Sequence, residues 1–174
     1  RRGGPDARQE DWIMTHELPT MHPRRVLTVL IADDHPIFRR GLCDVLAEDP
    51  TLRLVGEAGD GEEAWRLIQE LRPAVAVLDI HMPRRSGIEL GRLVSQERLH
   101  VELIILTMDA EEGLLHEALN LGIKGYLLKE DTPKGLLASI AEVRQGEAEV
   151  SPYFMDSLVQ DVVPIVKGGA SLIF

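Results

Sequence analysis

The sequence predicts an α/β fold, in which a doubly wound, five-stranded parallel sheet with strand order 2-1-3-4-5 lies between two layers of helices. Three observations support this prediction. Short apolar runs alternate with segments of helical periodicity five times between residues 26 and 146, which is typical of repeated βα units. Several apolar runs are continuous, as in strands that are buried on both faces. Right-handed crossovers between such strands then give the doubly wound order.

The first two predicted βα units end near residue 71. Residues 26–32 (VLTVLIA) form a strand that ends on an acidic pair, Asp33 and Asp34. A proline near the first turn favours the start of the following helix. Residues 52–58 form the second strand, and residues 60–71 form the second helix. The apolar stripe of the first helix, at helical spacing, is predicted to contain Ile37, Gly41, Leu42, Val45 and Leu46.

The third predicted strand is the stretch around which the other elements are arranged. In residues 74–79 (AVAVLD), five apolar residues run directly into a single carboxylate, Asp79. The next helix begins at Ser86, because Glu89 three residues later completes a capping box. The remaining predicted elements are a strand at 101–107, a helix at 111–120, a strand at 124–129 and a helix that starts at 132 and ends at Gly146.

The segments on either side of this alternation lack its periodicity. Residues 1–24 mix glycine, proline and charge, and we expect them to be a flexible extension of natural or vector origin. Residues 25–146 are the predicted folded domain. Residues 147–174 are expected to be a linker with a short helix over 151–163, too short to hold a DNA-binding domain.

Composition favours a soluble protein and disfavours several functions. The chain has 174 residues, of which 44% are hydrophobic and 28% charged, as in ordinary globular domains. Its net charge of −10 disfavours DNA binding by this chain alone. A single cysteine, Cys43, rules out an intrachain disulfide and is expected to fill the core rather than act as a nucleophile. Because no apolar run reaches membrane-spanning length, we expect a cytoplasmic protein without membrane contact.

The predicted strand order brings polar side chains together at the carboxyl ends of four strands. These side chains are Asp33, Asp34, Asp79, Thr107 and Lys129. In open parallel sheets this edge forms the ligand crevice. Three carboxylates in one crevice need a cation, and oxygen ligands suit Mg²⁺ or Mn²⁺. Asp79 would then be placed to attack phosphorus, with Lys129 neutralising the phosphoryl oxygens and Thr107 donating a hydrogen bond to one of them.

Each of these residues, taken singly, also has a structural interpretation. An acidic pair can cap a helix, and the threonine and lysine can be ordinary residues at strand ends. Their joint arrival at four adjacent strand ends favours the functional interpretation. His81, two residues after Asp79, lacks the spacing of a side-chain metal ligand. We therefore expect its backbone carbonyl, and not its imidazole, to face the metal.

These residues resemble the receiver domain of two-component response regulators, which has the CheY-like, flavodoxin-like fold. The resemblance runs from about Val26 to Gly146. It rests on four motifs, which are ADDH at 32–35, LDIHMP at 78–83, LT at 106–107 and KGYLLK at 124–129. One departure is Glu130, where many receivers have a cis proline.

The resemblance implies a role for each site residue. Asp79 would accept a phosphoryl group from a histidine kinase or phosphotransfer protein, in a Mg²⁺-dependent reaction. The acidic pair and the carbonyl of His81 would bind the metal. Thr107 and Tyr126 would form a conformational switch, and Lys129 would contact the phosphoryl group. Such a protein is not an enzyme but a phospho-acceptor that assists its own phosphorylation and dephosphorylation.

The motif DDHPIFRRGL at 33–42 is similar to the NarL/LuxR-type subfamily of response regulators. Members usually continue into a helix-turn-helix domain. The resemblance therefore implies that the switch controls transcription through a DNA-binding domain that this chain does not include. A homodimer is among the expected partners.

Two alternatives remain open at this point. A haloacid-dehalogenase-like phosphatase also uses an aspartyl nucleophile and Mg²⁺, but places a D-x-D motif after its first strand. The other alternative is an interaction module that keeps the fold and works without phosphorylation. Turnover of phosphate monoesters would favour the first, and failure to bind Mg²⁺ and a phosphate analogue would favour the second.

Overall fold

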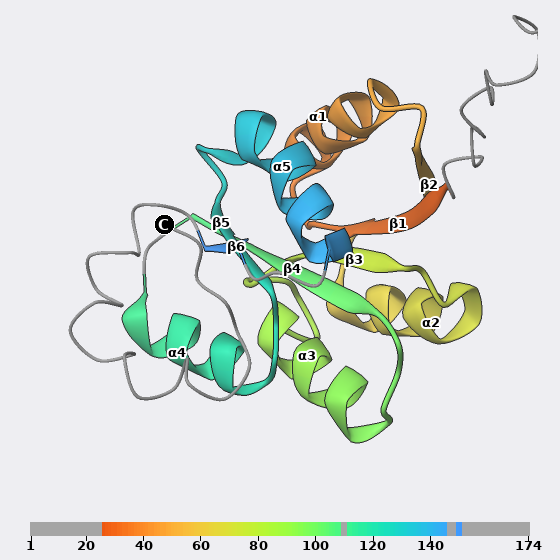
Figure 1. The fold of residues 1–174 in the computed structure, drawn as a ribbon. Helices are drawn as coiled ribbons and strands as arrows, with labels where there is room; N and C mark the ends of the chain where they lie inside the picture. The colour runs from red at the N-terminus through yellow and green to blue at the C-terminus, as the bar shows by residue number, and fades with distance from the viewer. Residues whose placement is uncertain (1–25, 109–110, 146–148, 151–174) are drawn as a thin grey trace, which may run out of the picture.

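A computed structural model describes residues 26–108, 111–145 and 149–150 of the chain, and Figure 1 shows their arrangement. These residues form one parallel sheet in the order β2-β1-β3-β4-β5-β6. Its strands are β1 (Leu27–Ala32), β2 (Leu52–Ala58), β3 (Val75–Asp79), β4 (Glu102–Thr107), β5 (Gly125–Leu128) and β6 (Glu149–Val150). The helices are α1 (Pro36–Ala47), α2 (Gly61–Leu71), α3 (Gly87–Gln96), α4 (Glu112–Asn120) and α5 (Thr132–Gln145). None of these helices is both long enough and apolar enough to cross a membrane.

The central strands of the sheet are buried on both faces, and the helices on either side confirm the predicted three-layer, doubly wound architecture. Helices α1 and α5 cover one face, and α2, α3 and α4 cover the other (Figure 1). Successive residues of a strand point to opposite faces. Within β3, Val75 and Val77 accordingly pack with α1 and α5, whereas Ala76 and Leu78 pack with α2, α3 and α4. This explains why the strand sequence is continuously apolar.

The sixth strand was not predicted from the sequence. Glu149 pairs with Gly125 and Val150 pairs with Tyr126, so β6 extends the sheet beyond β5. A two-residue strand has no measurable period, and its place in the sheet depends on the open edge of β5. The expectations for residues 1–24 and for a helix over 151–163 lie outside the described residues.

The apolar stripe of α1 differs from the prediction at two residues, Ile37 and Gly41, which are both exposed. Leu42 and Leu46 are buried as predicted, but Ile37 is 90% exposed. The stripe is centred on Phe38, Leu42 and Leu46, which are spaced by four residues, so Ile37 lies at its flank. On the same helix Cys43 is half-buried, and burial, together with the charge of nearby carboxylates, raises the pKa of its thiol to about 11. A protonated, partly buried thiol agrees with a packing role.

Two predicted helix ends are confirmed in detail. The Ser86 hydroxyl accepts a hydrogen bond from the Glu89 N–H, and the Glu89 carboxylate accepts one from the Ser86 N–H, which is a complete capping box. After α4, Gly122 has a φ of +76°. This left-handed conformation ends the helix and favours glycine.

Candidate functional site

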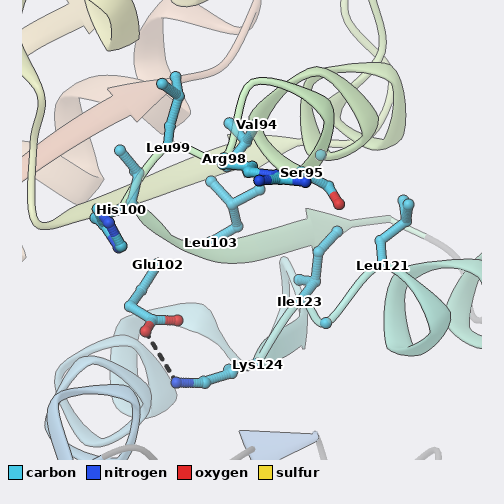
Figure 2. A pocket seen from close by; sticks show the side chains of 13 residues that line it. Val94, Ser95, Arg98, Leu99, His100, Glu102, Leu103, Leu121, Ile123 and Lys124 are labelled. Carbon is cyan, nitrogen blue, oxygen red and sulfur yellow. Dashed lines mark hydrogen bonds and ion pairs between the residues drawn. The ribbon is translucent and has the colours of Figure 1, made fainter.

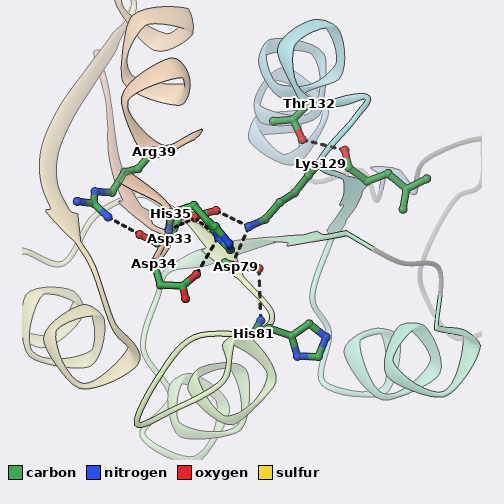
Figure 3. Close-up of polar contacts among 9 residues, drawn as sticks. Asp33, Asp34, His35, Arg39, Asp79, His81, Lys129 and Thr132 are labelled. Carbon is green, nitrogen blue, oxygen red and sulfur yellow. Dashed lines mark hydrogen bonds and ion pairs between the residues drawn. The ribbon is translucent and has the colours of Figure 1, made fainter. Parts of the chain in front are cut away.

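The predicted polar residues lie at the carboxyl ends of four adjacent strands. Figure 3 shows Asp33, Asp34, Asp79 and Lys129 gathered there. Asp33 follows β1, Asp79 ends β3, Thr107 ends β4 and Lys129 follows β5. All four are buried, with exposures of 5% or less. Asp34 is half-buried at the mouth of the site. The sequence therefore predicted correctly that these side chains lie at one edge of the sheet, because the strand ends could be read from the apolar runs; their chemical roles stay a prediction.

Lys129 is the central cation of this site. Its Nζ lies 2.8 Å from Asp33 Oδ2 and 2.8 Å from Asp79 Oδ2. The same ammonium lies 4.9 Å from the ring centroid of Phe38 on α1, close enough for a cation–π interaction. The peptide bond from Lys129 to Glu130 is trans, like the others among the described residues. One buried ammonium thus pairs with two buried carboxylates.

Burial and ion pairing have opposite effects on the pKa values of Asp79 and Lys129. Burial raises the pKa of Asp79 above its ordinary value, and the charge of Asp33 adds to this rise, although Lys129 opposes it. Burial acts to lower the pKa of Lys129, but its contacts with the two carboxylates outweigh burial and raise that pKa. Lys129 is therefore charged at neutral pH, and an ionised Asp79 depends on it.

The donor atoms fit a hard divalent cation. Oxygen or nitrogen atoms of Asp33, Asp34, His35 and Asp79 lie within 4.8 Å of one another. The carboxylate oxygen Asp34 Oδ1 is buried and accepts no hydrogen bond within the described part of the chain, although His35 Nδ1 is 3.0 Å away. A buried oxygen without a hydrogen bond is costly unless a cation is bound. Carboxylates in this arrangement suit Mg²⁺ or Mn²⁺.

His35, which directly follows the acidic pair and precedes α1, was not among the predicted site residues. In the structure its N–H donates to Asp33 Oδ1 over 2.8 Å, and its imidazole lies against both acidic residues. The available signal was its position directly after the acidic pair. The carbonyl of His81 was expected to face the metal, which stays a prediction; the structure shows that the N–H of the same residue lies 3.3 Å from Asp79 Oδ1. The exposed His81 imidazole instead lies 3.6 Å from Glu111.

Thr107 and Tyr126, the predicted switch pair, lie on adjacent strands and are both buried. Burial raises the pKa of Tyr126 to about 12, and the charge of Glu111 adds to the rise, whereas a hydrogen bond with Thr107 opposes it. The Tyr126 hydroxyl therefore stays protonated at physiological pH. A buried aromatic ring in contact with a strand-end hydroxyl can respond to a change at that strand end.

A glycine allows α3 to approach the end of β3 closely. A Cβ atom on Gly87 would lie 2.6 Å from the carbonyl oxygen of Asp79, a distance that any larger residue would have to relieve by moving the helix. The Gly87 N–H also donates to the Ile80 carbonyl over 3.1 Å. The backbone around Asp79 is thus fixed from both sides.

A pocket of about 310 Å³ lies at the opposite end of the sheet, and Figure 2 shows it. It is bordered by the end of α3, the start of β4 and the segment before β5. Lys124 and Glu102 form an ion pair of 2.9 Å at its rim. None of the clustered carboxylates lines this pocket, which is therefore separate from the candidate site.

Comparison with known proteins identifies the family. Residues 29–141 match the sequence model of the response regulator receiver domain. The chain belongs to this family. Its receiver fold accounts for the five βα units and for the strand order, both of which were predicted from the sequence. The family match also decides against the haloacid-dehalogenase-like alternative.

The relatives of this receiver are transcription regulators. It is 33% identical over 141 residues to the transcriptional regulatory protein DegU of Brevibacillus brevis, covering 81% of this chain and 60% of that protein. The chain thus spans about three fifths of the length of the curated relatives that it matches. Its similarity to such proteins makes it a receiver of the NarL/LuxR type.

Solved receiver structures share the fold. The receiver domain of NarL from Mycobacterium tuberculosis is 31% identical, with a TM-score of 0.67, and the match covers 70% of this chain and 98% of that one. The receiver domain of RcsB from Salmonella enterica serovar Typhimurium, in the presence of the phosphomimetic BeF₃⁻, is 29% identical, also with a TM-score of 0.67. That match covers 72% of this chain and 94% of the other.

Proposed function

We propose that Asp79 accepts a phosphoryl group from a phosphohistidine of a histidine kinase or phosphotransfer protein. The observation that carries this proposal is the position of the Asp79 carboxylate, at the end of a central strand and 2.8 Å from a buried ammonium. Two further carboxylates face the same crevice. The phosphomimetic described for the related RcsB receiver supports phosphorylation in a domain of this fold.

The chemistry is a transfer between two nucleophiles. An oxygen of Asp79 attacks phosphorus and forms an O–P bond, while the P–N bond of the donor breaks and the imidazole leaves. Lys129 is placed to neutralise the negative charge of the transferred phosphoryl group. Its Nζ already contacts Asp79 and needs only a small movement to reach a phosphoryl oxygen. Thr107, at the end of the neighbouring strand, can donate a hydrogen bond to another. Positioning and electrostatics of this kind account for most of phosphoryl-transfer catalysis.

We propose that the carboxylates of Asp33, Asp34 and Asp79 and the carbonyl of His81 hold Mg²⁺ or Mn²⁺. When bound, the metal supplies positive charge that neutralises the phosphoryl oxygens. The support is the donor set, with all three carboxylates in one cluster and a buried Asp34 oxygen that accepts no hydrogen bond among the described residues.

Asp34→Asn is expected to lower Mg²⁺ affinity by about tenfold or more, since it removes one charged ligand. The same change removes like-charge repulsion in the metal-free crevice, so the free energy of unfolding should not fall and should rise by up to about 1 kcal/mol. Calorimetry and chemical denaturation measure the two effects. Asp44→Asn, on the exposed face of α1, is the matched control. Unchanged Mg²⁺ affinity in Asp34→Asn would remove this site from the proposal.

The direct test of the proposed function is incubation with Mg²⁺ and a small phospho-donor, followed by intact-mass measurement. One stoichiometric phosphoryl group per chain is the expected result. Continuous release of phosphate without labelling would point to an enzyme instead. Failure to bind both Mg²⁺ and BeF₃⁻ would favour the interaction module that works without phosphorylation.

Phosphorylation is expected to reduce amide exchange over residues 107–130, because Thr107 must move inward to reach the phosphoryl group. That movement opens space into which the ring of Tyr126 can shift, and the surface around α4 and β5 changes with it. Hydrogen exchange with and without BeF₃⁻ measures the effect, with β1 and β2 as the internal reference. Equal protection in both states would contradict the switch.

We infer that the output is control of transcription through a DNA-binding domain, and that a homodimer forms on activation. The names of the relatives support this inference, since they include transcriptional regulators and a DNA-binding response regulator of the LuxR family. The receiver itself has no such role in the proposal, because the chain carries a net charge of −10 and phosphate contacts require basic surfaces.

A further inference from the structure

The loop between β3 and α3, residues 80–86, is fastened through its backbone to the start of α2. The N–H of Gly61 donates to the carbonyl of Pro83 over 3.1 Å. A Cβ atom on Gly61 would lie only 2.0 Å from the carbonyl oxygen of Arg85. Backbone therefore meets backbone here, and a side chain at position 61 would have to push the loop away.

Charged side chains reinforce the same contact. The Asp60 carboxylate caps α2, since its Oδ1 accepts hydrogen bonds of 2.9 Å from the N–H groups of Glu62 and Glu63. Its other oxygen, Oδ2, lies 2.8 Å from Nη1 of Arg84. Arg84 has a φ of +72°, a left-handed conformation that is strained for a residue with a Cβ atom. Arg85 also donates to Glu62 over 2.6 Å.

The other end of this loop belongs to the candidate site. Asp79 immediately precedes the loop, and the N–H of His81 contacts its carboxylate. A single residue, Met82, separates His81 from the first loop residue that contacts α2. Because so short a segment cannot absorb a displacement, a movement of Pro83 or Arg84 must also move the main chain of His81.

We propose that Asp60, Gly61 and Arg84 are positioning residues for the metal site, although none of them reaches the metal. They hold the loop so that the carbonyl of His81 is already in place, beside the carboxylates, when the metal binds. The inference rests on the proposed function, since it assumes that this carbonyl is a ligand. Groups behind the first ligands commonly control metal affinity in this way.

The test is titration with Mn²⁺, using the electron paramagnetic resonance signal of the free ion. Asp60→Asn keeps the helix cap, because asparagine caps as well as aspartate, but it loses the ion pair with Arg84. Arg84→Gly relaxes the strained φ and loses the same ion pair. We expect each to weaken Mn²⁺ binding by about tenfold, and Gly61→Ala by at least as much. Arg84→Lys, which keeps the charge, should restore most of the affinity.

Two controls match these variants. Arg66→Gln removes an exposed ion pair with Glu70 on the same helix, and Gly113→Ala adds a methyl group at a helical position with nothing within 4 Å. Both should bind Mn²⁺ like the parent. Thermal unfolding without metal separates positioning from folding. If the ion pair with Asp60 served only to offset the backbone strain at Arg84, Arg84→Gly would bind Mn²⁺ with parental affinity, because glycine adopts this φ without strain.

The outcomes are distinguishable from a failure of the proposed function. If the parent binds Mn²⁺ and Asp34→Asn does not, the metal site stands. Parental Mn²⁺ affinity in both Asp60→Asn and Arg84→Gly would then overturn only the positioning role, even if Gly61→Ala binds Mn²⁺ more weakly. If the parent itself binds no Mn²⁺, or Asp34→Asn binds it unchanged, both proposals fail together.

Discussion

Asp79→Asn is expected to abolish phosphorylation while leaving the fold intact. An amide has the shape of the carboxylate but does not attack phosphorus, and β3 is packed on both faces by residues that the change does not touch. Intact-mass measurement after treatment with Mg²⁺ and a phospho-donor should show complete loss of labelling. Asp44→Asn, an exposed carboxylate change, should label like the parent. Labelling that persists in Asp79→Asn would place the acceptor elsewhere.

The same variant is expected to be at least as stable as the parent at neutral pH. Burial raises the pKa of Asp79 in the folded state, so the folded protein holds this proton more tightly than the unfolded chain does. The stability from the protonated form is present below the unfolded pKa, about 4, and is lost as pH rises through the higher folded value. Asparagine is neutral at every pH, like the protonated carboxyl, so Asp79→Asn does not lose this stability as pH rises.

The sequence predicted the fold, and the gathering of the candidate site residues at one edge of the sheet, because both have local signals. The strand that ends on Asp79 reads as a continuous apolar run, and the residue that leaves the run marks the edge of the sheet. Strand order then brings Asp33, Thr107 and Lys129 to the same edge without any knowledge of side-chain contacts. Most of the candidate site follows from these two steps.

Features that depend on contacts between distant segments could not be predicted. The exposure of Ile37 depends on where the stripe of α1 meets the sheet, which its spacing alone does not fix. The tight approach of Gly61 to the loop after β3 joins residues more than twenty positions apart. Nor did the sequence show that Lys129 contacts Asp33 and Asp79 at once, rather than extending into solvent.

Lys129→Met is expected to cause the largest loss of stability, about 3 kcal/mol at neutral pH. Breaking a buried ion pair by removing one partner leaves uncompensated charge, and here the ammonium serves both Asp33 and Asp79 at 2.8 Å. Methionine keeps most of the aliphatic stem without its charge, so the loss reports charge rather than volume. Urea denaturation measures it. Lys124→Met, which breaks the half-exposed pair with Glu102, should cost less than about 1 kcal/mol.

The pH dependence of that loss tests its cause. Without Lys129 the pKa of Asp79, already raised by burial, rises further because the opposing ammonium is gone. A carboxyl whose folded pKa exceeds its unfolded value gains stability as pH falls. The gap between Lys129→Met and the parent should therefore narrow as pH falls from 7 toward 4, because Asp79 takes up a proton and no longer needs a cation. A gap that stays constant over this range would mean that the loss does not come from unpaired carboxylates, and the electrostatic account of this site would be wrong.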